Sequence, residues 1–154
     1  MSSPLGPLAL TAAPDGLRRV DFVEAGGREQ GGVRDAATLG HLDAAEEQLC
    51  TYFAGERRAF DLVLAPRGTE FQLAAWRVLQ TIPYGRTITY GEQARALGKP
   101  NAMRAVGGAN GRNPLAIVVP CHRVIGSGGR LAGYASGLDR KAWLLALEGQ
   151  PRPL

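Results

Sequence analysis

Cysteine is scarce in this sequence, which limits the kinds of protein that the chain can be. Only Cys50 and Cys121 occur in 154 residues. Two cysteines can form neither a disulfide framework nor a four-cysteine zinc site. A free thiol in such a chain is either a small buried apolar side chain or a nucleophile.

Long apolar runs are also missing. No stretch approaches the roughly 18 apolar residues of a membrane span, and residues 1–16 lack the basic start and apolar core of a secretory signal. Apolar residues make up 45% of the chain and charged residues 21%, as in ordinary globular proteins. We therefore expect a cytoplasmic protein with no membrane partner, whose thiols stay reduced.

Lysine is nearly absent, and the charges are distributed unevenly. Lys99 and Lys141 are the only lysines among 18 basic residues, a bias that genomic base composition would explain. Residues 1–66 hold six Arg and ten acidic residues, a net charge of −4, whereas residues 67–154 hold twelve basic and four acidic residues, a net charge of +8. A strongly basic half is a candidate for binding a polyanion such as DNA.

Residues 1–66 are expected to form a small α/β domain with an antiparallel sheet. Two short apolar runs flank the turn signal at 14–16, which predicts a β-hairpin. Apolar residues then recur at helical spacing before a glycine stop, at Leu42, Ala45, Leu49, Tyr52, Phe53 and Gly55. Cys50 is expected to be buried in that helix. The Gly-rich segment 26–32 predicts a loop, and segment 59–64 predicts a further strand.

Residues 67–154 are expected to form a mainly helical domain of the winged helix-turn-helix class. Capping boxes predict helix starts at Thr69 and Thr89. The second of these helices, a turn and a short helix over 101–110 make a helix-turn-helix. Gly107 and Gly108 lower the helix propensity of its second helix. Either tight packing or a close approach to nucleic acid would explain these two glycines.

The remaining segments complete the expected wing and core. The continuous apolar run 115–119 predicts a buried strand that ends at the cysteine. Segment 131–134 is expected to pair back on Val124 and Ile125 as the hairpin of the wing. Residues 138–147 show the spacing of a last helix.

Cys121 stands next to a histidine in the basic half. Only the thiolate form of cysteine is a strong nucleophile, so a base or positive surroundings must produce it. His122 can be that base, directly if the chain bends there or through a water. Glu148 is one of three acidic residues after position 90 that could orient the imidazole. The pair alone favours a buried, inert cysteine over a nucleophile.

Several motifs around this pair together resemble the O6-alkylguanine-DNA alkyltransferase family. The pattern Pro-Cys-His-Arg-Val at 120–124 is specific for that family and occurs without change. Further matches lie at Phe71, Gln72, Trp76, segments 82–85 and 104–108, Asn110, and segment 141–145. The resemblance is strong over 68–149 and loose before that. It implies a ribonuclease-H-like first domain and a DNA-binding second domain.

The resemblance implies a DNA repair protein that acts once. The family flips a damaged base out of the duplex and moves its alkyl group onto a cysteine, from O6 of guanine and less readily from O4 of thymine. Cys121 matches the acceptor, His122 the base that acts through a water, and Glu148 the acid that orients it. Asn113 matches the asparagine that ties the helix-turn-helix to the cysteine segment. No cofactor is implied, and the first domain has too few ligands for a metal site.

The DNA contacts carry over in the same way. Arg104 matches the arginine that fills the place of the flipped base, and Tyr90 the tyrosine that presses on the target phosphate and donates to guanine N3. The pocket border matches Tyr134, Ala135 and Lys141, and the small minor-groove residues match Ala102, Ala105 and Gly107. The expected partner is double-stranded DNA with alkylated bases, bound by a monomer. Without the resemblance, Tyr90 would be an ordinary aromatic, and Arg104 and Lys141 exposed charges.

Three other classes of protein remain to be weighed. A binding-only relative would replace the cysteine, which Cys121 argues against. A winged-helix regulator would bind DNA sequence-specifically and leave the thiol inert. A Cys-His hydrolase would turn over repeatedly, which the basic half argues against. The family pattern of a small residue and two glycines after Tyr134 is changed here, because Ser136 adds a side chain to that loop.

Overall fold

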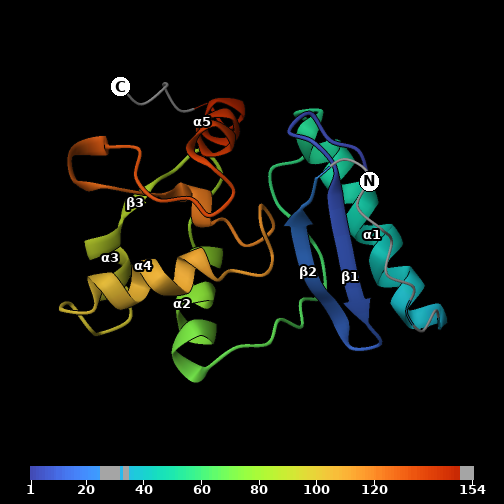
Figure 1. Ribbon diagram of the computed structural model, residues 1–154, viewed down its shortest axis with the longest axis horizontal. Helices are drawn as coiled ribbons and strands as arrows, with labels where there is room; N and C mark the ends of the chain where they lie inside the picture. The colour runs from blue at the N-terminus through green and yellow to red at the C-terminus, as the bar shows by residue number, and fades with distance from the viewer. Residues whose placement is uncertain (25–31, 33–34, 150–154) are drawn as a thin grey trace. The chain divides into compact units, whose positions relative to one another are not determined.

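The computed structural model describes residues 1–24, 32 and 35–149, and the chain divides into two compact units (Figure 1). The first unit comprises Met1–Arg67 together with Pro114–Val118. The second comprises Gly68–Asn113 and Val119–Leu154. The short segment 114–118 therefore belongs to the first unit, although both of its neighbours in the sequence belong to the second.

The first unit is a β-hairpin covered by one helix. Strands β1 (Leu8–Ala13) and β2 (Gly16–Phe22) pair antiparallel, and α1 (Ala36–Phe53) lies beside them (Figure 1). The Asp35 side chain caps α1 by accepting from the backbone N–H of Thr38 at 2.8 Å. The core side chains are Leu8, Leu17, Val20, Ala45, Leu49 and Tyr52. The predicted hairpin and helix are confirmed, while the loop predicted over 26–32 lies, apart from Gly32, outside the described residues.

The strand predicted over 59–64 is wrong. Only Leu64 forms a bridge, to Leu17, through backbone hydrogen bonds from Leu17 N to Val63 O and from Ala65 N to Leu17 O, both 2.8 Å. Gly16 marks how closely the two segments approach, since an added Cβ would lie 2.7 Å from the Val63 carbonyl oxygen. The pairing involves one residue of β2, so no ladder develops.

Two further predictions about buried segments need correction. Residues 115–119 are buried as predicted but form no strand, because Ile117 has a φ of 72° and only Leu115 bridges, to Val20. Cys50 is exposed rather than buried. Leu49 points into the core, and the next residue of an α-helix is rotated by about 100°. This rotation turns Cys50 away from the core.

The second unit is mainly helical. Its helices are α2 (Glu70–Gln80), α3 (Tyr90–Ala96), α4 (Met103–Gly111) and α5 (Leu138–Leu147), with short 3-10 turns η1 (Cys121–Arg123) and η2 (Ser127–Gly129). Both predicted capping boxes are present, at Thr69 and at Thr89. Among the described residues, no helix has both the length and the apolar character needed to cross a membrane.

The helix-turn-helix of α3 and α4 is joined by a buried amide pair. Gln93 Nε2 donates to Asn110 Oδ1 at 3.0 Å, and Asn110 Nδ2 donates back to Gln93 Oε1 at 2.7 Å. Trp76 Nε1 donates to the Ala109 carbonyl at 2.8 Å and ties α4 to α2. Satisfied buried polar pairs of this kind specify one packing arrangement. The predicted helix-turn-helix is confirmed.

The hairpin predicted for the wing is wrong. Strand β4 (Val124–Ile125) pairs parallel with β3 (Ile88–Thr89), and residues 131–134 form no strand. The carbonyls of Ala132 and Gly133 accept hydrogen bonds from side chains instead. A strand ladder would need these acceptors, so the side-chain contacts replace the hairpin.

Candidate active site

Cys121 begins η1, where the chain turns sharply out of the buried segment. Its Sγ accepts a hydrogen bond from Asn113 Nδ2 at 3.2 Å, and the same amide donates to the Val119 carbonyl at 2.8 Å. Asn113 follows directly after α4 and its C-cap Arg112. Asn113 therefore connects the end of the helix-turn-helix to the cysteine segment, as the sequence predicted.

The Cys121 thiol is protonated near neutral pH. Burial raises the pKa of Cys121, while the hydrogen bond from Asn113 and the positive charge of Lys141 lower it to a smaller extent. The sequence left open whether the surroundings produce a resting thiolate, and they do not. A reaction at this sulfur therefore needs a base that removes the proton during the step itself.

His122 is placed to be that base. It is fully buried, and its Nε2 lies 2.8 Å from Glu148 Oε2. Burial raises the pKa of Glu148, but the hydrogen bonds from His122 and Arg123 overcome this effect and lower the pKa to about 2. An ionised carboxylate can only accept, so Nε2 carries the imidazole proton and Nδ1 is an acceptor. Nδ1 is buried and has no hydrogen-bond partner among the described residues.

The chain bends at η1, as it must if His122 is to act on its neighbour Cys121. Neighbouring side chains of a strand point to opposite faces, whereas Cys121 and His122 are consecutive residues of a 3-10 turn. No direct hydrogen bond joins the two side chains in the described part of the chain. A proton relay through one water is compatible with this arrangement.

Lys141 is buried at this site, as Arg123 is, and it holds the loop that contains residues 132 and 133. Its Nζ donates to the carbonyls of Val124 at 2.5 Å, Ala132 at 2.6 Å and Gly133 at 3.0 Å. Burial lowers the pKa of Lys141 to about 8, although Cys121 opposes the shift. The interpretation of Lys141 as an exposed charge is therefore wrong.

Tyr90 joins the same loop from the start of α3. Its hydroxyl donates to the Ala132 carbonyl at 2.9 Å. Gly133 packs so closely against Tyr90 that an added Cβ would lie 2.9 Å from the Tyr90 hydroxyl oxygen. Burial raises the pKa of Tyr90, so the phenol keeps its proton. Tyr134 has a buried hydroxyl with no partner among the described residues, and Ala135 after it is exposed. Tyr90 and Tyr134 both interact electrostatically with Cys121, and burial keeps both phenols protonated.

The outer face of α4 carries small residues and one arginine. Arg104, Ala105 and Gly108 are exposed, and Ala102 and Gly107 are partly exposed. A Cβ added at Gly108 would meet no described atom within 4 Å, and at Gly107 only the Tyr90 ring at 4.0 Å. Packing within the described residues therefore does not require these glycines.

Arg123 and Tyr84 are the site residues to which the sequence reasoning gave no role. Arg123 contacts Glu148, and Tyr84 lies over the guanidinium of Arg123. Both belong to motifs that the sequence had singled out, at 120–124 and 82–85. The motifs marked these residues, but only the fold shows which groups they contact.

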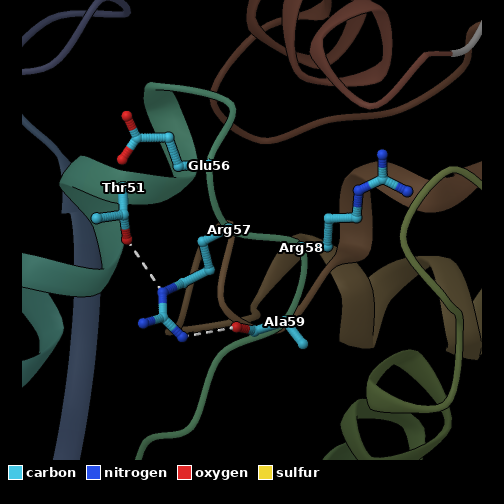
Figure 2. Close-up of a pocket in the computed structure, with 5 residues that line it drawn as sticks. All are labelled: Thr51, Glu56, Arg57, Arg58 and Ala59. Atoms are coloured by element: carbon cyan, nitrogen blue, oxygen red, sulfur yellow. Dashed lines mark hydrogen bonds between the residues drawn. The ribbon is translucent and has the colours of Figure 1, made fainter.

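A hollow in the first unit has none of this chemistry. It is lined by Thr51, Glu56, Arg57, Arg58 and Ala59 (Figure 2). Arg57 donates hydrogen bonds to Thr51 Oγ1 at 3.0 Å and to the Ala59 carbonyl at 3.1 Å (Figure 2). None of the predicted site residues lines it. The part of the chain that the structure describes holds no cluster of three or more His, Cys, Asp or Glu residues suited to a metal ion.

Comparison with known families defines the class to which this fold and site belong. Residues 1–66 match the ribonuclease-like domain of 6-O-methylguanine DNA methyltransferase, and residues 70–150 match the DNA binding domain of the same family. The chain belongs to the 6-O-methylguanine DNA methyltransferase family. This assignment confirms the resemblance and the predicted fold class, a ribonuclease-like α/β domain followed by a helical DNA-binding domain.

Individual relatives match over nearly the whole chain. A methylated-DNA–protein-cysteine methyltransferase of Methanosarcina acetivorans is 53% identical over 149 residues, which cover 96% of this chain and 94% of the relative. A methyltransferase of the same name from Mycobacterium tuberculosis is 47% identical over 153 residues, covering 99% and 92%. The crystal structure of Mycobacterium tuberculosis OGT in complex with DNA superimposes with a TM-score of 0.85 at 48% identity, covering 96% of this chain and 89% of that one.

Proposed function

We propose that this protein repairs alkylated DNA by moving the alkyl group from O6 of guanine, and less readily from O4 of thymine, onto Cys121. The observation that carries the proposal is the arrangement of Cys121, His122 and Glu148. The thiol is protonated, the imidazole has a free acceptor nitrogen, and its other nitrogen donates to an ionised carboxylate. The Cys121 sulfur becomes a strong nucleophile when the thiol proton moves to the imidazole.

The proposed step balances as a single displacement. The thiol proton passes through a water to His122 Nδ1, and the sulfur forms a bond to the alkyl carbon. The carbon–O6 bond breaks, and its electron pair stays on the guanine. The guanine then takes up a proton from water, and the His122 imidazolium releases its proton to water, so the charges balance. The product on the protein is a thioether, which water does not cleave. Each molecule therefore acts once, and no cofactor takes part.

We propose that α4 brings the DNA to this site. The small residues Ala105 and Gly107 of α4 and Ala102 at its N-cap are at least partly exposed, and they suit close contact with a minor groove, where sequence information is poor. Arg104 would occupy the place of the flipped base, because a planar cation can stack and donate hydrogen bonds. The net charge of +8 over residues 67–154 supports binding of the phosphate backbone.

The residues around the loop complete the proposed base pocket. Tyr90 would press on the target phosphate and donate to guanine N3. Tyr134, Ala135 and Lys141 would border the base. We propose that residues 67–154 carry the reaction, that residues 1–66 form the separate α/β domain, and that one monomer repairs one base in double-stranded DNA.

The stoichiometry of repair tests this function. A fixed amount of protein is incubated with a tenfold excess of duplex that contains one O6-methylguanine, and restored guanine is counted over time. We expect one guanine restored for each protein molecule, followed by no further repair. Continued turnover would indicate a hydrolytic or regenerating enzyme. Binding without repair would indicate a regulator or a recognition protein with an inert thiol.

A further inference from the structure

Arg123 belongs to the same motif as Cys121 and His122, and no step of the proposed transfer uses it. Its side chain is 8% exposed, and the Glu148 side chain that it contacts is fully buried. A buried guanidinium is costly unless its donors are well paired. The hydrogen-bond partners of Arg123 therefore indicate the role of its buried charge.

Arg123 binds both oxygens of the Glu148 carboxylate. Nε donates to Oε1 at 2.6 Å, and Nη2 donates to Oε2 at 3.0 Å. His122 Nε2 donates to the same Oε2 at 2.8 Å. A two-point contact fixes the plane of a carboxylate as well as its position. Arg123 therefore determines how Glu148 meets the imidazole.

Residues 82–85 hold Arg123 and Glu148 in place. Nη1 of Arg123 donates to the Ile82 carbonyl at 2.7 Å, and its Cζ lies 5.7 Å from the centre of the Tyr84 ring. The Tyr84 hydroxyl donates to the Leu147 carbonyl at 3.2 Å. Gly85 adopts a φ of 77°, and an added Cβ there would lie 3.2 Å from the Glu148 carbonyl oxygen. The turn at residues 82–85 thus supports both Arg123 and Glu148.

The charged groups around His122 affect whether its imidazole takes up a second proton. Burial lowers the pKa of His122, Glu148 raises it, and the positive charges of Arg123 and Lys141 lower it again. Helix α2 also packs against η1, and its buried side chains Ala75, Trp76 and Leu79 are uncharged. Glu148 therefore favours a second proton on the imidazole, whereas burial, the largest effect, disfavours it, and Arg123 adds to the effect of burial through its contact with the same carboxylate.

We propose that Arg123 is a positioning residue, which fixes Glu148 so that His122 stays neutral, with its proton on Nε2 and Nδ1 free to accept. The effect on the rate rests on the proposed function, since Nδ1 is the atom that would receive the thiol proton. The effect on the imidazole does not rest on it. The two effects are therefore measured separately.

NMR titration of the imidazoles tests the first effect. The chain has two histidines, His41 and His122, so the variant His41→Gln assigns both sets of signals. In the unmodified protein we expect His122 to be neutral and protonated on Nε2 down to below its ordinary pKa of about 6.5. Arg123→Gln should raise the midpoint by roughly one pH unit or more. Arg123→Lys keeps the charge and should leave the midpoint close to that of the unmodified protein.

The pH profile of alkyl transfer tests the second effect, at saturating methylated duplex so that affinity does not enter. Arg123→Gln should slow transfer more near pH 6 than near pH 9, by up to roughly tenfold for each pH unit by which the His122 midpoint rises, because only the neutral imidazole acts as the base. Arg123→Lys should slow it by a small factor that is equal at all pH values. Arg77→Gln removes an exposed arginine from α2 and should not change the profile.

The outcomes separate positioning from structural support. The proposal is contradicted if His122 keeps its midpoint and tautomer in Arg123→Gln, or if both Arg123 variants lose the same factor at every pH. If Arg123→Gln does not fold, Arg123→Lys still decides, because a transfer rate that stays unchanged without the two-point contact would contradict the proposal. If the unmodified protein transfers no alkyl group, the proposed function fails while the imidazole titration still tests Arg123.

Discussion

The two units of this protein treat charged side chains in opposite ways. In the first unit the ion pairs lie on the surface, between Arg18 and Asp15 and between Arg19 and Asp21. In the second unit Glu148 pairs with His122 and Arg123 in the interior. The buried polar and charged residues of the second unit are Gln93, Asn110, His122, Arg123, Lys141 and Glu148, whereas Thr38 is the one described for the first.

This difference shows where the chain accepts the cost of burying charge. Replacing a buried ion pair by apolar residues is often neutral or stabilising, so such pairs are weak evidence of a role in stability. Their concentration around one cysteine is better explained by chemistry that needs an oriented, buried base. The first unit has an ordinary apolar core and surface charges, as a structural domain requires.

The two cysteines give the largest expected contrast between the units. Cys121→Ser should abolish alkyl transfer, because a serine hydroxyl in the same place is a far weaker nucleophile, and should still bind methylated duplex. Cys50→Ser changes an exposed thiol on α1 and should leave the transfer rate unchanged. Nucleoside analysis of the duplex measures both rates. A substantial loss in Cys50→Ser would move part of the chemistry to the first unit.

The two kinds of ion pair give the next contrast. Glu148→Gln leaves the Arg123 charge buried without a counter-charge and should lower the free energy of unfolding by about 3–5 kcal/mol. Asp21→Asn removes the partner of Arg19, whose side chain is 53% exposed, and should lower it by roughly 0–1 kcal/mol. Urea denaturation measures both values. Equal losses of unfolding free energy in the two variants would show that burial does not determine how much each ion pair contributes to stability.

Acid should reveal the same difference. Folding lowers the pKa of Glu148 to about 2, so its ionisation stabilises the protein above the pKa of the unfolded chain, about 4.3. This contribution is lost as the pH falls from about 5 towards 2. Glu148→Gln has no such group and should show a flatter dependence of stability on pH over this range. Parallel curves for the two proteins would contradict the assignment.

The two lysines of the chain provide a smaller contrast. Lys141→Met removes the donor for the carbonyls of Val124, Ala132 and Gly133 and should destabilise the protein by about 1–3 kcal/mol. Lys99 is exposed, with its Nζ 5.3 Å from the centre of the Phe71 ring. Lys99→Met should therefore change stability by less than about 1 kcal/mol. Thermal unfolding of the two variants compares them, and a harmless Lys141→Met would show that Lys141 does not hold the loop.

Two helix glycines give the smallest effect on stability. Gly40 in α1 and Gly108 in α4 are both exposed, and a Cβ at either position would meet no described atom within 4 Å. Alanine at each should stabilise the protein by about 0.5–1 kcal/mol through helix propensity. Gly108→Ala should nevertheless weaken binding to duplex DNA, whereas Gly40→Ala should not. Unchanged affinity in Gly108→Ala would remove close DNA approach as the reason for that glycine.

Local signals predicted the parts of the fold that local physics controls. The capping boxes at Thr69 and Thr89, the hairpin and the helix-turn-helix depend on residues close in sequence, and the structure confirms them. The strands expected over 59–64, 115–119 and 131–134 depend on finding distant partners. Apolar composition shows that such a segment is buried, but it does not show whether its backbone has a ladder to join.

The site was predictable only as far as its motifs allowed. The proximity of Cys121, His122, Glu148 and Asn113 follows the family pattern and is seen in the structure. The burial of Lys141 and the contact of Arg123 with Glu148 could not be read from the sequence, because an isolated basic residue normally indicates an exposed surface. Only the placement of facing carbonyls and of a buried carboxylate makes these two cations interior.

The mass of the protein after one reaction tests the central claim most directly. The protein is incubated with a duplex containing one O6-methylguanine, weighed intact and then digested into peptides. We predict a gain of one methylene, located on the peptide that contains Cys121 and absent from Cys121→Ser. A protein that restores guanine without gaining mass, or gains it on a peptide containing Cys50, would contradict the account.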